Sequence, residues 1–463
     1  MREVSARDLF KSAFDDLHGN KIEVAGDKFR TLLNADPDSA DFLYGASCYY
    51  MKSNAKGVAL NLLKQALSFK PNFVPALNNV GYILYNSQKI EDSREYFLKA
   101  IRINEKDCDA YINMAATYVA WGSPDEAIKY CKKALAIKPH EKQAKNNLSL
   151  SYLEKGDYAK GFNLYDARSI IENELEMAYS KNGTPEWDGK SEGVVCIYGE
   201  QGIGDEIMFG SLLKQVMKTN EVVLDCHPRL MNVWRYSYPG LKVFGTRKEN
   251  IRAWPSIVKI DYKTSIASLC NLYLKSESDF VKEAYLKPNP NLFNYYKEKV
   301  KSNKLKIGIS WSGGTPATNL SARKTNLEQW LPILKQDADF YSFQYVRSAE
   351  KDIEEFNKKY PDIKIHHWRK EIDDYEKTIA LAANMDLIIS VPQSIVHVGG
   401  AMSIPTWQLT PYRAMWQMGP RGKDLPWYEN ARSFWQSKPD DWKTVFKNAG
   451  EALCDLLQKN TGK

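Results

Sequence analysis

A period of thirty-four residues runs through the first third of the chain, and no other feature constrains the fold as strongly. Pro37, Pro71 and Pro139 lie on this spacing, and Glu105 occupies the remaining position of the series. A small residue recurs on the same period, at Ala13, Ser47, Gly81, Ala115 and Ser149. Small residues at a fixed register let paired helices cross closely, and a proline after the second helix ends it. The period therefore predicts a stack of antiparallel helix pairs.

Helix pairs with this period are typical of tetratricopeptide repeats. The chain holds four full copies and part of a fifth, which end near Tyr165. Stacked repeats form an extended concave surface that binds other polypeptides. The sequence therefore predicts a protein or peptide partner, held by the repeats of residues 1–165.

Composition excludes several classes of function. The chain has 463 residues and a net charge of +7, and this mild excess comes without an arginine-rich block, so a nucleic-acid partner is not expected. No apolar run reaches the length of a membrane span, and no signal-peptide core precedes the repeats. The seven cysteines are scattered without a C-x-x-C pair, which favours reduced thiols and no metal site. We expect a cytoplasmic protein.

The pattern changes after the repeats. Residues 166–193 lose the period and end in turn-rich text, which predicts a linker. From Val194 onward, short apolar segments alternate with helical ones, the pattern of parallel sheets covered by helices. The predicted strands are Val194–Tyr198, Val222–Asp225, Leu241–Phe244, Lys306–Trp311, Phe340–Phe343, Ile363–His366, Leu387–Ser390 and Thr406–Leu409. The expected fold is thus α plus α/β, with an α-solenoid followed by two Rossmann-like, doubly wound halves at residues 194–300 and 301–463.

The first loop with chemical potential is GEQGIGDEIMFG, from Gly199 to Gly210, directly after a predicted strand. Its glycines allow a sharp turn and a close approach to a ligand, and Asp205 falls where the next helix begins. A carboxylate there is placed to accept a proton from an attacking hydroxyl. Capping of the helix by Asp205 is the alternative. The glycine spacing is not that of a dinucleotide fingerprint, so hydride transfer is not implied.

The second loop follows the strand that ends near Trp311. Ser312 and Gly313 lie in it, and Arg323 and Lys324 come just before the next helix. Adjacent cations beside a strand end suit a diphosphate, and arginine can bind it through two hydrogen bonds. A solvated basic turn is the alternative interpretation.

The third loop, SVPQSIVHVGGA, follows the strand Leu387–Ser390. Gln393 and Ser394 lie at the start of a predicted helix, where main-chain N–H groups form an anion site. His397 lies one turn later on the same helix face, either as a functional group or as a packed core residue. Further along, aromatic residues either stack on a base or sugar or form core. They are Tyr412, Trp416, Trp427 and Tyr428, and Arg413 lies among them as a phosphate candidate.

These three loops, in this order, resemble those of the heptosyltransferase-like glycosyltransferases of family nine. The segments PEWDG, PRLMNVWRYSYPG, SARK and PWYENARSFWQS add to the resemblance, which covers essentially the whole chain together with the repeats. It implies a GT-B fold, with the acceptor on the first half and a nucleotide-sugar, as co-substrate and not cofactor, on the second. The implied transfer is inverting and metal-independent.

The resemblance also assigns roles. Asp205 would be the catalytic base, with Glu200, Gln201, Gly202 and Gly204 in the loop near the acceptor. On the donor side the resemblance implies Arg323, with Lys324 beside it, and it keeps His397. Ser312, Gly313, Gln393 and Ser394 complete our predicted donor site by their places in the second and third loops. The chain departs from the family at Pro392 and Gln393, where an Asp-Thr pair is usual. Our leading hypothesis is a protein glycosyltransferase. The alternatives are a surface-glycan glycosyltransferase and a non-catalytic adaptor with a degenerate transferase domain.

Overall fold

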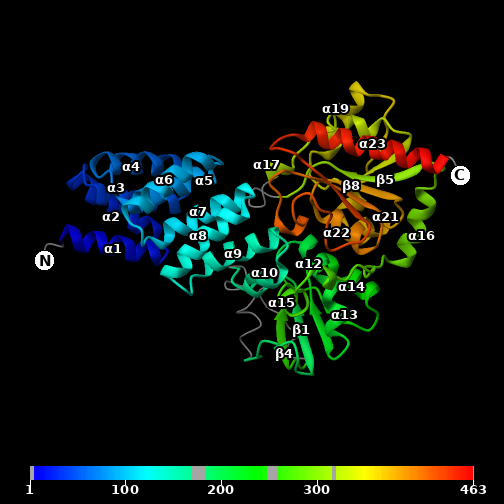
Figure 1. The fold of residues 1–463 in the computed structure, drawn as a ribbon, viewed down its shortest axis with the longest axis horizontal. Helices are drawn as coiled ribbons and strands as arrows, with labels where there is room; N and C mark the ends of the chain where they lie inside the picture. The colour runs from blue at the N-terminus through cyan, green and yellow to red at the C-terminus, as the bar shows by residue number, and fades with distance from the viewer. Residues whose placement is uncertain (1–4, 169–182, 248–257, 315–319, 462–463) are drawn as a thin grey trace. The chain divides into compact units, whose positions relative to one another are not determined.

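The computed structural model describes residues 5–168, 183–247, 258–314 and 320–461 (Figure 1). It divides into two compact units, Met1–Ser151 and Tyr152–Lys463. The domain limits that the sequence suggests at residues 165, 193 and 300 stay predictions. Most of the predicted linker, residues 169–182, lies outside the described residues.

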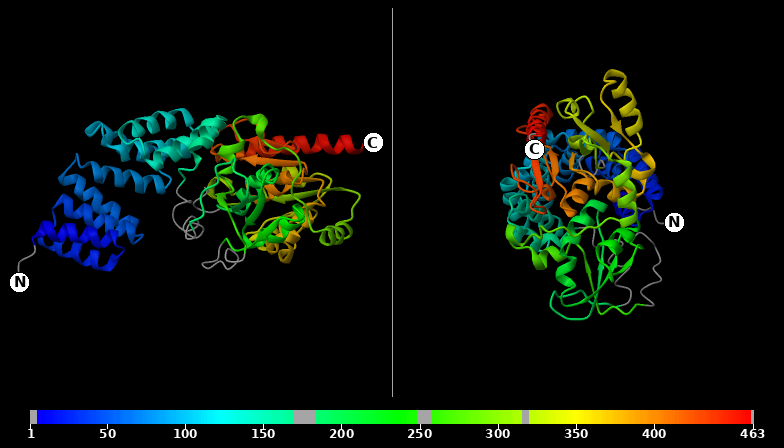
Figure 2. Two further views of the ribbon diagram at one scale, coloured as in Figure 1. Left: turned by 90° about the horizontal axis from the view of Figure 1, so that it is seen from below. Right: turned by 90° about the vertical axis from the view of Figure 1, so that its right-hand side faces the viewer.

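The first unit is a stack of antiparallel helix pairs, as the period predicts (Figure 2). Its helices are α1 (Ala6–His18), α2 (Ile22–Ala35), α3 (Ala40–Lys52), α4 (Lys56–Phe69), α5 (Val74–Asn86), α6 (Ile90–Ile103), α7 (Cys108–Trp121), α8 (Pro124–Ile137) and most of α9 (Lys142–Glu154). Pro37, Pro71, Glu105 and Pro139 all lie in the turns that separate one pair from the next. The recurring small residues are buried, and a Cβ at Gly81 would lie 2.5 Å from the ring of Phe97. The helices of a pair therefore cross where the sequence has no room for a larger side chain.

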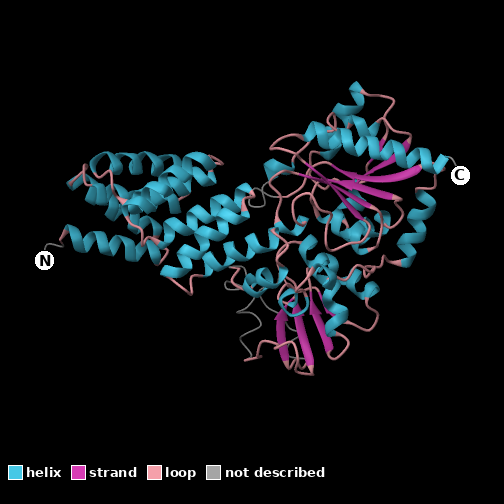
Figure 3. Ribbon diagram, in the orientation of Figure 1, coloured by secondary structure: helices cyan, strands magenta, loops and turns pink. Residues whose placement is uncertain are grey.

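The second unit contains two parallel sheets (Figure 3). The first has the order β3-β2-β1-β4, with β1 (Val194–Tyr198), β2 (Glu221–Asp225), β3 (Lys242–Phe244) and β4 (Tyr262–Ser265). The second has the order β10-β9-β8-β5-β6-β7, with β5 (Leu305–Ser310), β6 (Ala338–Ser342), β7 (Ile365–His366), β8 (Leu387–Ser390), β9 (Thr406–Thr410) and β10 (Ala431–Trp435). Every pairing is parallel. The two Rossmann-like halves that the sequence predicts are confirmed.

Helices cover these sheets because most residues of their strands are buried on both faces. In the first half they are α12 (Ile203–Phe209), α13 (Leu213–Val216), α14 (Met231–Ser237) and α15 (Leu269–Tyr273). In the second half they are α16 (Pro290–Lys299), α17 (Leu320–Arg323), α18 (Leu331–Leu334), α19 (Ala349–Lys359), α20 (Arg369–Asp373), α21 (Tyr375–Ala382), α22 (Ser394–Ala401) and α23 (Trp442–Thr461). The core of the second half joins Ile307, Ile389 and Leu409 of the strands to Trp442 and Phe446 of α23.

The strand order places the three loops of interest at the points where each sheet changes direction. In the first sheet, β1 lies between β2 and β4, and the loop from Gly199 follows it. In the second sheet, β5 and β8 are neighbours, and the loops from Trp311 and Val391 follow them. Crevices outside the carboxyl ends of strands at such switch points are where open α/β sheets bind ligands.

The second unit also includes α10 (Tyr158–Tyr165), which lies within the predicted solenoid. Its Phe162 and Tyr165 rings meet the ring of Trp416 with centroids 5.6 and 5.3 Å apart. Trp187, from the predicted linker, is buried and donates a main-chain hydrogen bond of 2.8 Å to the carbonyl of Lys263 in β4. Both segments therefore contribute to the packing of the two-sheet unit.

Candidate active site

A cavity of about 310 Å³ lies where the loops of the two halves meet. The first half contributes Gly202, Ile203, Gly204, Asp205 and Arg229 to its lining. The second half contributes Gly314, Arg323, Phe343, Tyr345, Ile372, Tyr375, Thr378, Gln393, Ser394, Ile395, His397, Met415 and Met418. Its size is at the lower end of the range for ligand pockets, about 300–1,000 Å³. The cavity thus brings together five of the predicted site residues: Asp205, Arg323, Gln393, Ser394 and His397. In the sequence, Asp205 precedes each of the other four by more than one hundred residues.

Asp205 lies in the first turn of α12 and has two hydrogen-bond donors. Its Oδ2 accepts from the main-chain N–H of Gly202 at 3.1 Å, which is the capping contact, and its Oδ1 accepts from Nε2 of Gln417 at 3.2 Å. Burial raises the pKa of Asp205, and these two hydrogen bonds oppose the rise. Asp205 therefore both caps α12 and faces the cavity. A carboxylate with a raised pKa is a stronger base than an exposed one.

The other residues of the first loop divide between the cavity and the protein interior. Gly202 and Gly204 line the cavity, whereas Glu200 and Gln201 turn toward the end of α10. A Cβ at Gly204 would lie 3.1 Å from Cδ2 of His397 and 3.2 Å from Cα of Ser394. Glycine at position 204 thus allows α12 of one half to approach α22 of the other.

In the second loop, only part of the predicted donor set reaches the cavity. Arg323, at the end of α17, is buried and donates from Nη1 to the carbonyl of Pro392 at 3.0 Å. Burial lowers its pKa, but a guanidinium in a protein stays charged. Lys324 is exposed and is not part of the lining. The predicted pair of cations is therefore divided, with one member in the cavity and one at the surface.

Ser312 and Gly313 lie outside the cavity lining and pack against the residues around it. Oε1 of Gln344 accepts from the N–H groups of Trp311 and Ser312 at 2.9 and 3.0 Å, and its Nε2 donates to the carbonyl of Ser312 at 2.7 Å. A Cβ at Gly313 would lie 2.8 Å from Cβ of Gln393. These two residues hold the second loop against the third, and Gly314, the residue that follows them, lines the cavity.

In the third loop, α22 begins at the cavity. Gln393 is its N-terminal flanking residue and donates from Nε2 to Oγ of Ser390 at 3.3 Å. His397 is buried, and its Nδ1 is 3.1 Å from Oη of Tyr428. Burial lowers the pKa of His397 to about 4. At neutral pH this imidazole is uncharged, so it can hydrogen-bond a ligand but cannot supply a positive charge.

Arg229, Tyr375 and Gln417 belong to the site although sequence reasoning assigned them no role. Arg229 donates from Nη2 to the carbonyl of Asp373 at 3.2 Å, and its guanidinium lies 5.1 Å from the centroid of the Tyr375 ring. A signal existed for Arg229, because it follows the carboxyl end of β2 by four residues within PRLMN. The approach of Gln417 to Asp205 spans 212 positions of the sequence, and no local pattern announces it.

Three of the four aromatic candidates near the carboxyl end are core residues. Trp416 and Trp427 are buried and pack against Phe209, with ring centroids 6.4 and 5.8 Å away. Tyr428 is buried against Gly400 of α22. For these three rings the packing supports the core alternative. Tyr412 is half-buried, and the guanidinium of Arg421 lies 3.9 Å from the centroid of its ring.

In the part of the chain that the structure describes, no three or more His, Cys, Asp or Glu side chains gather as a metal site requires, and the expected metal independence stays untested by this. Among the same residues, no helix combines the length and the apolar character needed to cross a membrane.

Comparison with known proteins relates the chain to repeat proteins. Tetratricopeptide-repeat family models match residues 74–107 and 108–141. The protein FlbA of Caulobacter vibrioides is 25% identical over 479 aligned positions, covering 97% of this chain and 78% of FlbA. The human protein O-mannosyl-transferase TMTC3 is 30% identical over 97 residues, 21% of this chain and 11% of TMTC3. A match of that length is too short to span the two-sheet unit.

Among solved structures, MamA resembles 34% of the chain and 91% of its own length, with 21% identity and a TM-score of 0.30. PilF of Pseudomonas aeruginosa resembles 46% of the chain and 85% of its own length, with 17% identity and a TM-score of 0.35. The family models confirm the predicted repeats. The amino-terminal unit is a tetratricopeptide-repeat solenoid, and the relationship of the two-sheet unit to glycosyltransferases stays a prediction.

Proposed function

We propose that this protein is a glycosyltransferase that moves a sugar from a nucleotide-sugar, bound by the two-sheet unit, to a protein acceptor held by the repeats. The observation that carries the proposal is one cavity, at the switch points of two Rossmann-like sheets, that is lined by both Asp205 and Arg323. A base and a buried cation in one cavity are what the transfer needs. The name of TMTC3, a protein O-mannosyl-transferase similar to this chain over 97 residues, agrees with a transferase.

The proposed reaction is a single displacement that inverts the anomeric carbon. The hydroxyl oxygen of the acceptor forms a bond to the anomeric carbon, and Asp205 accepts the proton that this hydroxyl loses. The bond from that carbon to the diphosphate oxygen breaks, and the nucleoside diphosphate leaves. Arg323 and the N–H groups at the start of α22 stabilise the negative charge on the leaving group. These groups supply positive charge from the protein itself, so the proposed transfer is metal-independent.

We also place the protein in the cytoplasm. All seven cysteines lie in the described residues as free thiols. Thiols that stay unpaired fit a reducing compartment.

A thermal-shift panel of nucleoside diphosphates and their sugars, followed by assay of the best donor, tests the proposal. A ligand at about one hundred times its Kd adds roughly 2.7 kcal/mol to the folded state, a measurable shift. Arg323→Ala should lose that shift, and Lys324→Ala, a change at the adjacent exposed cation, should keep it. Asp205→Asn should abolish transfer and retain donor binding. A folded wild-type protein that responds to no nucleotide would instead support the non-catalytic adaptor.

A further inference from the structure

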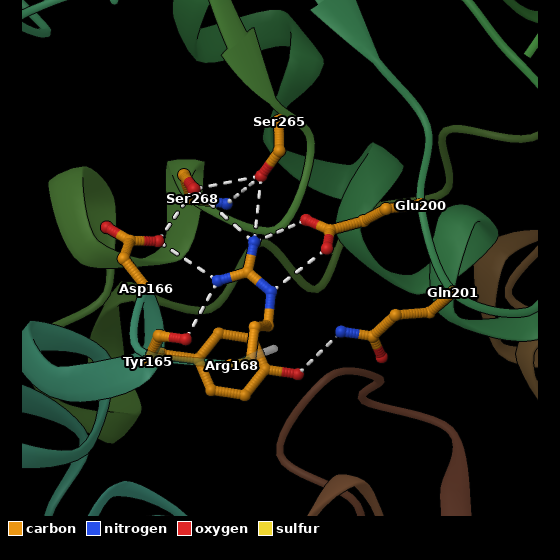
Figure 4. Close-up of polar contacts among 7 residues, drawn as sticks. All are labelled: Tyr165, Asp166, Arg168, Glu200, Gln201, Ser265 and Ser268. Carbon is orange, nitrogen blue, oxygen red and sulfur yellow. Dashed lines mark hydrogen bonds and ion pairs between the residues drawn. The ribbon is translucent and has the colours of Figure 1, made fainter. Parts of the chain in front are cut away.

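Arg168 is a buried cation that the mechanism above does not use. It follows α10, and each nitrogen of its guanidinium donates to at least one acceptor (Figure 4). Nε donates to Oε2 of Glu200 at 2.9 Å, and Nη2 bonds the second oxygen of the same carboxylate. Nη2 also donates to Oγ of Ser265 at 2.8 Å, and Nη1 donates to the carbonyl of Tyr165 at 2.9 Å and to Asp166 at 3.0 Å. Such a two-pronged pair fixes the orientation of both partners.

The partner of Arg168 lies in the loop that carries the candidate base. Glu200 is only 1% exposed and comes directly before Gln201, whose φ of +59° is in the left-handed region. A residue other than glycine holds that conformation only where its surroundings impose it. Two contacts do so. Nε2 of Gln201 donates to Oη of Tyr165 at 3.0 Å (Figure 4), and the main-chain carbonyl of Gln201 accepts from Nη1 of Arg247 at 3.1 Å. Both side chains that leave this loop toward α10 therefore end on residues at the end of α10.

The same helix supports Asp205 from the opposite half. Tyr165 packs edge-on against Trp416, the residue before Gln417, and Gln417 donates to the Asp205 carboxylate. The loop before Asp205 and the side chain that bonds Asp205 thus share α10 as their support. An ion pair that served stability alone would not need to be placed on the base loop.

Electrostatics gives the pair a second consequence. After burial, the negative charge of Glu200 is among the causes that raise the pKa of Asp205. Arg168 offsets that charge at close range. Arg323 from the second half and the buried phenols of Tyr165 and Tyr428 also interact electrostatically with Asp205. The same cavity is lined by further charged or titratable side chains, those of Arg229, Tyr375 and His397.

We propose that Arg168 is a positioning residue for the transfer, which through Glu200 holds the loop that presents Asp205, so that the end of α10 sets the geometry of the base. The proposal rests on the proposed function for its catalytic consequence. It makes Arg168 act through another residue, without contact to either substrate.

Two variants test the proposal with a matched control. Tyr165→Phe removes the hydrogen bond to Gln201 and keeps the ring against Trp416, and Arg168→Lys keeps the charge but loses the two-pronged contact. Tyr238→Phe is the control, because Oη of Tyr238 donates to the carbonyl of Gly210 at 3.3 Å, at the opposite end of α12 from Asp205 and outside residues 199–206. We expect faster hydrogen exchange of the amides of residues 199–206 in both test variants. We also expect at least a tenfold lower kcat with the donor KM within twofold of wild type, and neither change in the control.

The pH profile separates positioning from simple support. Arg168→Gln leaves the Glu200 charge without its partner, so the acid limb of kcat/KM should move to higher pH. The double variant Arg168→Gln/Glu200→Gln removes both charges and should return that limb toward its wild-type position. Removing one member of a buried ion pair is strongly destabilising, so Tyr165→Phe and Arg168→Lys decide the matter if Arg168→Gln does not fold.

The outcomes distinguish this proposal from the proposed function. Unchanged loop exchange and unchanged kcat in folded Tyr165→Phe and Arg168→Lys overturn the role of Arg168. A wild-type protein that transfers no sugar with any donor contradicts the proposed function, and loop exchange in the same variants then decides whether Arg168 holds the loop.

Discussion

At the scale of single residues, His397 shows how burial sets the chemistry of the cavity. Its imidazole has a pKa near 4 in the folded protein, against 6.5 for an ordinary histidine. Between these two pH values the unfolded state binds the proton and the folded state does not, so His397 makes stability fall as the pH falls. The difference between these two pKa values corresponds to about 3 kcal/mol. This contribution is fully present above pH 6.5 and is lost by about pH 4.

Substitution of His397 isolates that contribution. Glu206, whose pKa is raised to about 7 by burial, gives the opposite trend over nearly the same range, so the wild-type profile alone is uninformative. We expect the difference in unfolding free energy between wild type and His397→Gln to fall by about 3 kcal/mol from pH 7 to pH 4. Urea titrations at several pH values measure it. A constant difference for His397→Gln would mean that the imidazole is not buried.

The residues of the site that the sequence predicted share one property: each lies within a few positions of the carboxyl end of a recognisable strand or the start of a recognisable helix. Asp205, Gln393, Ser394 and His397 are found in this way, and all line the cavity. Lys324 met the same rule and lies at the surface, because adjacent residues point in different directions. Arg168 and Gln417 could not be found, since their partners are distant in sequence and are brought near only by tertiary packing.

At the scale of elements, the contact between α12 and α22 depends on one glycine. Any side chain at position 204 meets His397 and the main chain of Ser394 at about 3.1–3.2 Å, and main chain cannot move aside as the end of a side chain can. We expect Gly204→Ala to destabilise the second unit by about 1 kcal/mol or more and to lower transfer by displacing Asp205. Gly57→Ala, where nothing lies within 4 Å of the added carbon, should be neutral or stabilising. Equal melting temperatures for the two variants would contradict the close contact.

The repeats offer a second prediction at this scale. Asn79, Asn113 and Asn147 recur on the thirty-four-residue period in α5, α7 and α9, where Asn79 and Asn113 are half-buried and Asn147 is buried. A half-buried amide can bond a peptide main chain through both donor and acceptor. Tyr82, three residues after Asn79, is 45% exposed. We expect Asn79→Ala/Tyr82→Ala to raise the KM for a protein acceptor about tenfold, a loss of about 1.4 kcal/mol, with the donor KM unchanged. The exposed Val58 on α4 is the control, and equal effects of Val58→Ala would place the acceptor elsewhere.

The sequence was sufficient to predict the strands that are mainly apolar, and the prediction missed two strands that carry a cation. The eight predicted strands all occur, within one to two residues at their ends. The sequence gives no comparable signal for β4, YKTS, or for β10, ARSFW, because both carry a cation within four or five residues. Lys263 of β4 is buried, yet its ammonium pairs with Glu186 at 3.2 Å. A lysine that finds a partner in the folded state breaks the apolar pattern on which strand prediction depends.

At the scale of the whole molecule, the period and the packing disagree about where the repeats end. By sequence, α10 completes the last helix pair, and a Cβ at Gly161 would lie 2.5 Å from Leu153 of α9. By packing, α10 belongs to the two-sheet unit, since Tyr158 meets Phe280 at 4.8 Å and Phe162 meets Trp416 at 5.6 Å between ring centroids. One helix therefore serves both as the last element of the repeats and as part of the core around the candidate base.

This double role predicts how the chain can be divided. A fragment of residues 152–463 retains α10 and should fold, bind donor and melt close to the second unit of the full chain. A fragment of residues 166–463 loses Tyr158, Phe162 and Tyr165 from the aromatic core. Truncating one buried Phe costs about 3–5 kcal/mol, so the shorter fragment should lose at least about 5 kcal/mol of stability. It should also expose Trp416, which tryptophan fluorescence reports as a red shift.

Calorimetry of the two fragments, with Phe162→Ala in the longer one as an intermediate case, measures the effect. We expect the highest melting temperature for the 152–463 fragment, a lower one for its Phe162→Ala variant and the lowest for the 166–463 fragment. Equal melting temperatures for the two fragments would assign α10 to the repeats alone. Because Tyr165 and Arg168 connect that helix to the base loop, the same result would also remove the structural basis for a base that is positioned by the last repeat.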